Sequence, residues 1–190
     1  MLLFLIAVSL QQADASPNVL NITDLLEALN TTEKLWLGIR SYDWHEAPQR
    51  HNCVYVEKQS LTDSEYIFKQ HYIMNAKEYV LDFDAALSRG TCDGPTMNVR
   101  SKSGEGAITY TLRTWEKTAK CGVLTFIDKN NKTQCELYAW DSQVVIINMT
   151  SAYLCEWEYD KLCDYKHDGS AYECRGVLPV PTEPPLPACR

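Results

Sequence analysis

The chain has 190 residues, of which eight are cysteines, and its net charge is −7. This acidic balance argues against a nucleic-acid partner, because binding to phosphates requires clustered Lys and Arg. The length suits one domain with its own hydrophobic core, and we expect it to be a monomer.

The N-terminus has the features of an export signal. Residues Leu2 to Leu10 form a short apolar run, and Ala13-Asp14-Ala15 follows as a cleavage site. We therefore predict a signal peptide over 1–15 and a single mature domain over 16–190. No stretch reaches the roughly 20 apolar residues of a membrane-spanning helix. We expect a secreted, extracellular protein without a membrane partner.

Eight cysteines in an exported chain predict up to four disulfides rather than a metal site. The sequence contains no Cys-x-x-Cys pair and no Cys/His cluster with zinc spacing, so we expect neither metal nor cofactor. N-glycosylation sequons also fit a secretory route and place their asparagines on the surface. The four acceptors are Asn21, Asn30, Asn131 and Asn148.

Two helices are predicted. Asn21 can cap a short helix that ends near Leu29, where leucines recur at helical spacing. A second helix is expected from Ser151 to Cys163. The tail from Gly176 to Arg190 contains five prolines, so it should be extended.

The segments between the helices have the length and composition of strands. Ile108, Tyr110 and Leu112 alternate with polar residues, as in a half-buried antiparallel strand. Eight such segments, separated by turn signals, predict an antiparallel barrel with room for one small ligand. The segments are Leu35 to Tyr42, Asn52 to Glu57, Glu65 to Met74, Glu78 to Phe83, Thr96 to Arg100, Ala107 to Trp115, Gly122 to Ile127 and Cys135 to Trp140.

Short motifs in the second half of the chain add a family resemblance. Cys121-Gly122-Val123, Glu136-Leu137-Tyr138 and Cys155 follow one another at a spacing that resembles the signature of tick salivary lipocalins, the histamine-binding protein family. Residues 35–42 and 53–56 extend the resemblance. It implies a mainly β, eight-stranded lipocalin-type barrel with a C-terminal helix on its wall. It also implies salivary capture of a small mediator of host inflammation.

The resemblance also implies disulfide pairs. The family pattern pairs Cys121 with Cys155, and Cys53 with Cys174. The remaining cysteines then suggest Cys135 with Cys163, and Cys92 with Cys189 as a tether for the proline-rich tail. Spacing alone does not choose among the connectivities of these last four.

A biogenic amine such as histamine or serotonin needs a carboxylate for its charge and aromatic faces for its ring. Glu136 matches the family's inward acid, and Tyr138 shares its strand face. Asp43 lies between Tyr42 and Trp44, where family members place ligand contacts. Tyr110 is a further aromatic candidate. The alternative is that the aromatic residues only pack the barrel and that Asp43 is a turn residue.

Other residues favour a lipid. Gly122 stands where the family usually has Asp, and Ile108 replaces an aromatic residue of amine binders. An inward Arg100 would repel a cation and hold a carboxylate, as in a leukotriene or fatty acid. The opposite orientation of the strand from Thr96 to Arg100, with Met97 and Val99 facing inward, fits the sequence equally well.

No nucleophile elbow, nucleotide-binding loop or zinc-protease motif occurs, so we expect no enzyme activity. The leading interpretation is a secreted lipocalin that sequesters a biogenic amine to suppress host defence. The alternatives are a lipid- or sterol-binding lipocalin that modulates host immune cells and a surface-acting protein inhibitor.

Overall fold

The computed structural model describes residues 20–42, 45–46, 49–104, 106–144, 151–163 and 167–168. The predicted signal peptide and proline-rich tail lie outside these residues. So do Asn148, Cys174 and Cys189.

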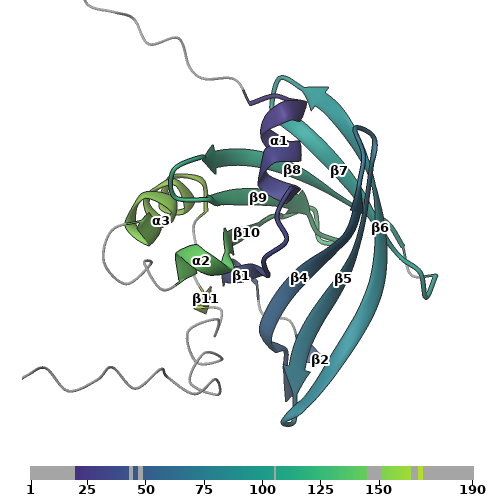
Figure 1. Ribbon diagram of the computed structural model, residues 1–190. Coiled ribbons are helices and arrows are strands. Elements are labelled where there is room, and N and C mark those ends of the chain that lie inside the picture. The colour runs from purple at the N-terminus through teal and green to yellow at the C-terminus, as the bar shows by residue number, and fades with distance from the viewer. Residues whose placement is uncertain are drawn as a thin grey trace, which may run out of the picture.

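Eight antiparallel strands form a closed barrel, as predicted (Figure 1). Neighbouring strands along the chain pair in succession, and the first and last close the ring when Leu37 pairs with Tyr138. The strands are β1 (Leu35–Arg40), β4 (Asn52–Leu61), β5 (Glu65–Met74), β6 (Lys77–Thr91), β7 (Gly94–Ser101), β8 (Ile108–Glu116), β9 (Cys121–Ile127) and β10 (Thr133–Trp140).

Several short elements surround the barrel. β2 (His45–Glu46) and β3 (Gln49–Arg50) form a small hairpin, and β11 (His167–Asp168) pairs with the second half of β1. The helices are α1 (Ile22–Leu29), α2 (Asp141–Val144) and α3 (Ser151–Leu162). No helix among the described residues combines the length and apolarity needed to cross a membrane.

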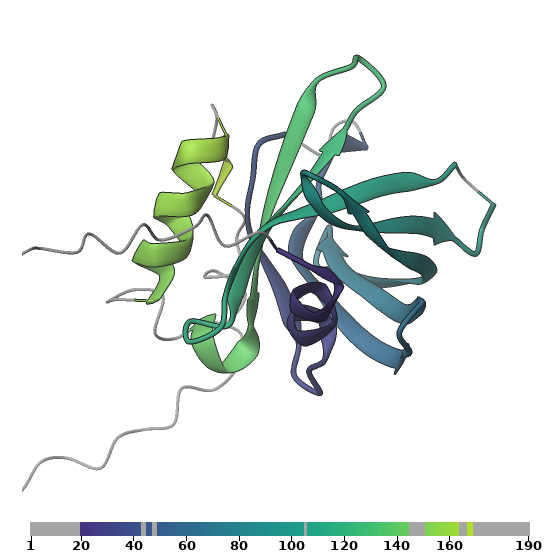
Figure 2. The ribbon, with the colours of Figure 1, turned by 90° about the horizontal axis from the view of Figure 1, so that it is seen from above.

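Helix α1 closes one end of the barrel. It begins where the Asn21 side chain accepts a hydrogen bond from the Thr23 N–H, and Asp24 accepts one from the Asn21 N–H. Leu25 and Leu29 are buried in the same cluster as the inward side chains of the strands. Figures 1 and 2 show α1 among the strands and α3 outside the barrel. The opposite end, where β1, β5, β7 and β9 finish, is the open end.

A bulge in β1 changes which side chains face inward. Leu37 pairs with Tyr138, but the register shifts before Ile39 pairs with Leu137. Leu37 therefore packs inside the barrel, whereas Ile39 packs on the outer wall against the cluster around α3. After the bulge, Arg40 is inward, opposite Glu136.

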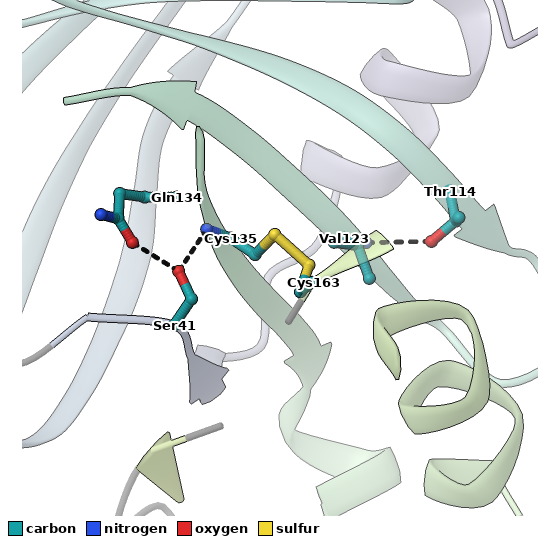
Figure 3. The surroundings of a disulfide bond; sticks show 6 residues. All are labelled: Ser41, Thr114, Val123, Gln134, Cys135 and Cys163. Carbon is teal, nitrogen blue, oxygen red and sulfur yellow. Dashed lines mark hydrogen bonds between the residues drawn. A yellow bond between two sulfur atoms is a disulfide. The ribbon is translucent and has the colours of Figure 1, made fainter. Parts of the chain in front are cut away.

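Disulfides fasten α3 to the outer wall of β9 and β10. Cys121 is bonded to Cys155 and Cys135 to Cys163, with Cα–Cα distances of 6.2 and 6.3 Å. Both are predicted pairs. Beside the second one, Ser41 accepts a hydrogen bond from the Cys135 N–H and donates one to Gln134 (Figure 3). The Ser41 side chain thus ties the end of β1 to β10.

The other two predicted pairs have different outcomes. Cys53 is disulfide-bonded, but its predicted partner Cys174 lies outside the described residues, so that pairing stays a prediction. The predicted bond from Cys92 is wrong, because Cys92 is a free, exposed cysteine. It lies in the turn between β6 and β7, whereas α3 packs on β8, β9 and β10.

Strand β6 is much longer than predicted. The expected segment was Glu78 to Phe83, but the strand covers Lys77–Thr91. Residues 77–86 pair with β5 and residues 83–91 pair with β7, so the strand is held from both sides in turn. The second half of β6 contains Ala and Ser, which have a weak intrinsic preference for strands, and it is extended because it pairs with β7.

Candidate ligand-binding site

A pocket of about 680 Å³ lies at the open end of the barrel. Its floor is aromatic: Tyr110 and Phe126 have ring centroids 5.0 Å apart, and Tyr42 meets Phe126 edge-on at 5.4 Å. Ile108 and Ile127 line its sides and are largely exposed. Asp128, Lys129, Asn130 and Gln134 supply the polar part of the rim. We call this the mouth pocket.

Glu136 lies behind the aromatic floor. Its side chain is 2% exposed, and Oε1 accepts a hydrogen bond from the Tyr42 hydroxyl. In the part of the chain that the structure describes, Oε2 has no close hydrogen-bond partner. Burial raises the pKa of Glu136, although the Tyr42 and Tyr138 hydroxyls and the Arg40 charge act in the opposite direction. The site therefore favours the protonated, neutral carboxyl group.

Burial, together with the adjacent Glu136 carboxyl group, raises the pKa of three tyrosines well above 10. These are Tyr42, Tyr110 and Tyr138. Their hydroxyl groups consequently keep their protons and can donate hydrogen bonds. Glu136 is thus a buried carboxyl group among phenols.

A second, smaller cavity of about 40 Å³ lies inside the barrel, next to Glu136 and Tyr138. Tyr110 lines both this interior cavity and the mouth pocket, and Tyr42 spans from the mouth pocket to Glu136. The interior cavity can hold water, but a benzene ring occupies a cavity of about 150 Å³. A ring-sized ligand can therefore reach Glu136 only if Tyr42 moves aside.

The structure brings together four of the predicted ligand residues: Tyr42, Tyr110, Glu136 and Tyr138. Asp43 and Trp44 lie outside the described residues, so their roles stay predictions.

Arg100 does not belong to the site. It is exposed on the outer wall, while Met97 and Val99 are buried inside. An inward Arg100 was wrong because the register of β7 against β6 and β8 gives the inner face to the apolar residues.

Gly122 is the inward position where an aspartate would supply a second carboxylate for an amine. A Cβ atom there would lie 2.5 Å from the Thr114 carbonyl oxygen and 3.2 Å from the Trp115 ring. The space beside Gly122 is thus filled by β8. This barrel has no room for an aspartate at that position unless Trp115 and the β8 backbone move.

Sequence reasoning missed two inward residues, Arg40 and Gln70. Gln70 is buried with its Nε2 unpaired, and it follows Tyr66 and Phe68 on the inner face of β5. Strict alternation along β5 could have found Gln70. Alternation along β1 could not have found Arg40, because the bulge reverses its side.

Three predicted glycosylation acceptors, Asn21, Asn30 and Asn131, are exposed, as acceptors must be, and their modification stays a prediction. Among the described residues, no group of three or more His, Cys, Asp or Glu side chains could hold a metal ion.

No model of a known protein family matches the sequence, and no curated protein is similar to it. In structure, the chain is similar to Japanin from Rhipicephalus appendiculatus, solved bound to cholesterol. The two chains are 13% identical, the TM-score is 0.52, and the match covers 74% of this chain and 93% of Japanin. At this identity the likeness shows the fold, which is the lipocalin-type barrel that the sequence predicted.

Proposed function

We propose that this protein is a secreted lipocalin that captures a small, largely apolar ligand at its open end and lowers the free concentration of that ligand. The mouth pocket carries the proposal. Its volume of about 680 Å³ falls in the range of roughly 300–1,000 Å³ typical of small-molecule sites, and its floor is aromatic. Capture is stoichiometric, and the protein carries out no turnover.

The chemistry around the pocket favours a lipid, such as a sterol or a fatty acid. The exposed Ile108 and Ile127 offer apolar surface to the body of such a ligand. The carboxyl group behind the floor is held toward its neutral form, and the Arg40 charge adjacent to it opposes a cation. The likeness to cholesterol-bound Japanin supports the same class. The resemblance of the Cys121, Glu136 and Cys155 motifs to those of tick salivary lipocalins supports a mediator of host inflammation as the ligand.

A biogenic amine is the second candidate, and Glu136 is the observation that favours it. Its Oε2 atom has no close hydrogen-bond partner among the described side chains, and three tyrosines lie around the carboxyl group. An ammonium group could ionise Glu136 and pair with it. This candidate requires Tyr42 to leave its hydrogen bond and open the interior cavity.

The two candidates predict opposite results for Glu136→Gln. The amide resembles the protonated acid in shape and neutrality, so lipid binding should be nearly unchanged. Amine binding should weaken by about tenfold or more, because a charge-assisted contact is lost. Glu65→Gln, at an exposed position at the start of β5, is the matched control.

The measurement is calorimetric titration of the oxidised, eukaryotically expressed protein with histamine, serotonin, oleic acid and cholesterol, with native mass spectrometry for copurified lipid. We expect saturable binding or copurification of a lipid and no heat with either amine. Saturable amine binding that Glu136→Gln abolishes would replace the lipid proposal with the amine candidate. Absence of all binding would contradict both.

A further inference from the structure

Arg40 is a charged side chain buried inside the barrel without sufficient partners. It is 4% exposed and lies near the end of β1. Its Nη2 donates a hydrogen bond to the His51 carbonyl oxygen at 3.2 Å. Its Nε and Nη1 atoms are buried and have no acceptor among the residues that the structure describes. A guanidinium group has five N–H donors and stays charged, so these unmade hydrogen bonds destabilise the barrel.

The adjacent acid forms no hydrogen bond with this guanidinium group among the described residues. Arg40 and Glu136 are register partners on β1 and β10, yet no ion pair joins them in the described structure. Glu136 instead accepts a hydrogen bond from the Tyr42 hydroxyl through Oε1. Burial raises the pKa of Glu136, which favours its neutral form. The Tyr42 ring, 5.8 Å from the Arg40 Cζ atom, provides only a weak additional contact.

Arg40 is separated from the mouth pocket by a single side chain. Tyr42 lines the mouth pocket, lies against the Arg40 guanidinium and is hydrogen-bonded to Glu136. A ligand whose body occupies the aromatic floor therefore needs only to displace Tyr42 to bring its head group to Arg40.

We propose that Arg40 binds the carboxylate of an amphipathic organic acid whose apolar body occupies the mouth pocket. The inference rests on the proposed lipid-binding function and names the head group. One carboxylate carries one negative charge, which matches one guanidinium, and its two oxygens can accept from the unpaired N–H groups. Glu136 in its protonated form can donate a hydrogen bond to the same carboxylate, since its buried Oε2 has no hydrogen-bond partner among the described residues.

A pair of fluorescent probes isolates the charge of the head group: 11-(dansylamino)undecanoic acid and its methyl ester. We expect the wild-type protein to bind the acid about tenfold more tightly than the ester, because only the acid forms a charge-assisted contact. Arg40→Met should remove this preference. Arg100→Met, which removes an exposed arginine on the outer wall, should retain the preference and is the matched control.

The wild-type ratio of acid to ester affinity tests the proposal even where Arg40→Met fails to fold. Equal affinity of the wild-type protein for the two probes would overturn the role of Arg40 while leaving lipid binding intact. A preference that persists in a folded Arg40→Met protein would also overturn it. Failure of the wild-type protein to bind either probe would contradict the proposed function itself, and with it this inference.

Discussion

At the scale of single residues, the most unusual group is Glu136, a carboxylic acid enclosed by phenols and apolar side chains. A carboxyl group in this setting loses the hydration that stabilises its anion. Its proton affinity therefore depends on whether the barrel is folded, and folding stability must depend on pH in a defined direction.

Burial raises the folded-state pKa of Glu136 above 4.5, its ordinary value and the one expected in the unfolded chain. The folded protein thus retains a proton that the unfolded chain releases as the pH rises above about 4.5. The contribution of Glu136 to the free energy of unfolding is fully present below that pH and is lost as the pH rises through the folded-state pKa. Glu136→Gln lacks this dependence.

Urea denaturation of the wild type and Glu136→Gln from about pH 4 to about pH 8 measures the effect. The difference in unfolding free energy, wild type minus variant, should decrease with rising pH. A difference that is constant, or that increases with pH, would contradict the raised pKa.

Gly122 sets a second residue-scale limit, because β8 occupies the space where its side chain would be. Gly122→Ala should lower the free energy of unfolding by about 1–3 kcal/mol, as expected for overpacking a filled interior. Gly106→Ala is the control, since a Cβ atom there has no neighbour within 4 Å. Denaturation of both variants tests this, and equal stability would show that β8 yields without cost.

The site was predictable only in part, and the bulge before Ile39 explains why. Glu136 and Tyr138 follow simple alternation on β10, so a motif and a two-residue period identified them. In β1, the same period places Arg40 on the face opposite Leu37, whereas the bulge brings both inside. A prediction that applies a two-residue period along the whole strand assigns every side chain beyond the bulge to the wrong face of the sheet.

At the scale of elements, α1 depends strongly on how it begins. It has eight residues, too few for a stable isolated helix, so capping and burial must hold it in place. Asn21 provides the cap, and Lys117 pairs with Asp24 at 3.0 Å to hold the first turn against the β8–β9 connection.

Asn21→Ala should lower the free energy of unfolding by about 1 kcal/mol through loss of the cap. Asn21→Asp keeps an oxygen acceptor at that position and should remain close to the wild type. Both substitutions remove the glycosylation sequon, so their difference in chemical denaturation isolates the cap. If the two variants proved equally stable, the cap would not contribute.

Predictability differed among the elements. The strand over Glu65–Met74 was predicted to the residue, because its alternating pattern agrees with the final packing. The helix over Ser151–Leu162 was predicted to within one residue, although its Trp157 and Leu162 side chains are exposed. The length of β6 was underestimated, because two partner strands stabilise it. The β2–β3 hairpin and β11 were not predicted, since two-residue strands carry no periodic signal.

At the scale of the whole molecule, the order of the strands decides where binding takes place. A meander of eight antiparallel strands puts alternate connections at opposite ends, and α1 occupies one of these ends. Access to the interior is therefore from the other end, where the mouth pocket lies. The composition predicted this architecture, because eight amphipathic strands bury their apolar faces and their edges together only by closing.

The described disulfides divide the barrel into two mechanically unequal halves. Both fasten α3 to β9 and β10, whereas β5, β6 and β7 have no disulfide among their described residues and depend on ladder hydrogen bonds and packing. Arg40 and Glu136 belong to β1 and β10, on the stapled side, and the wall across from α3 is the compliant one. We therefore expect the barrel to accommodate ligands of different girth by movement of that wall, while Arg40 and Glu136 keep their positions.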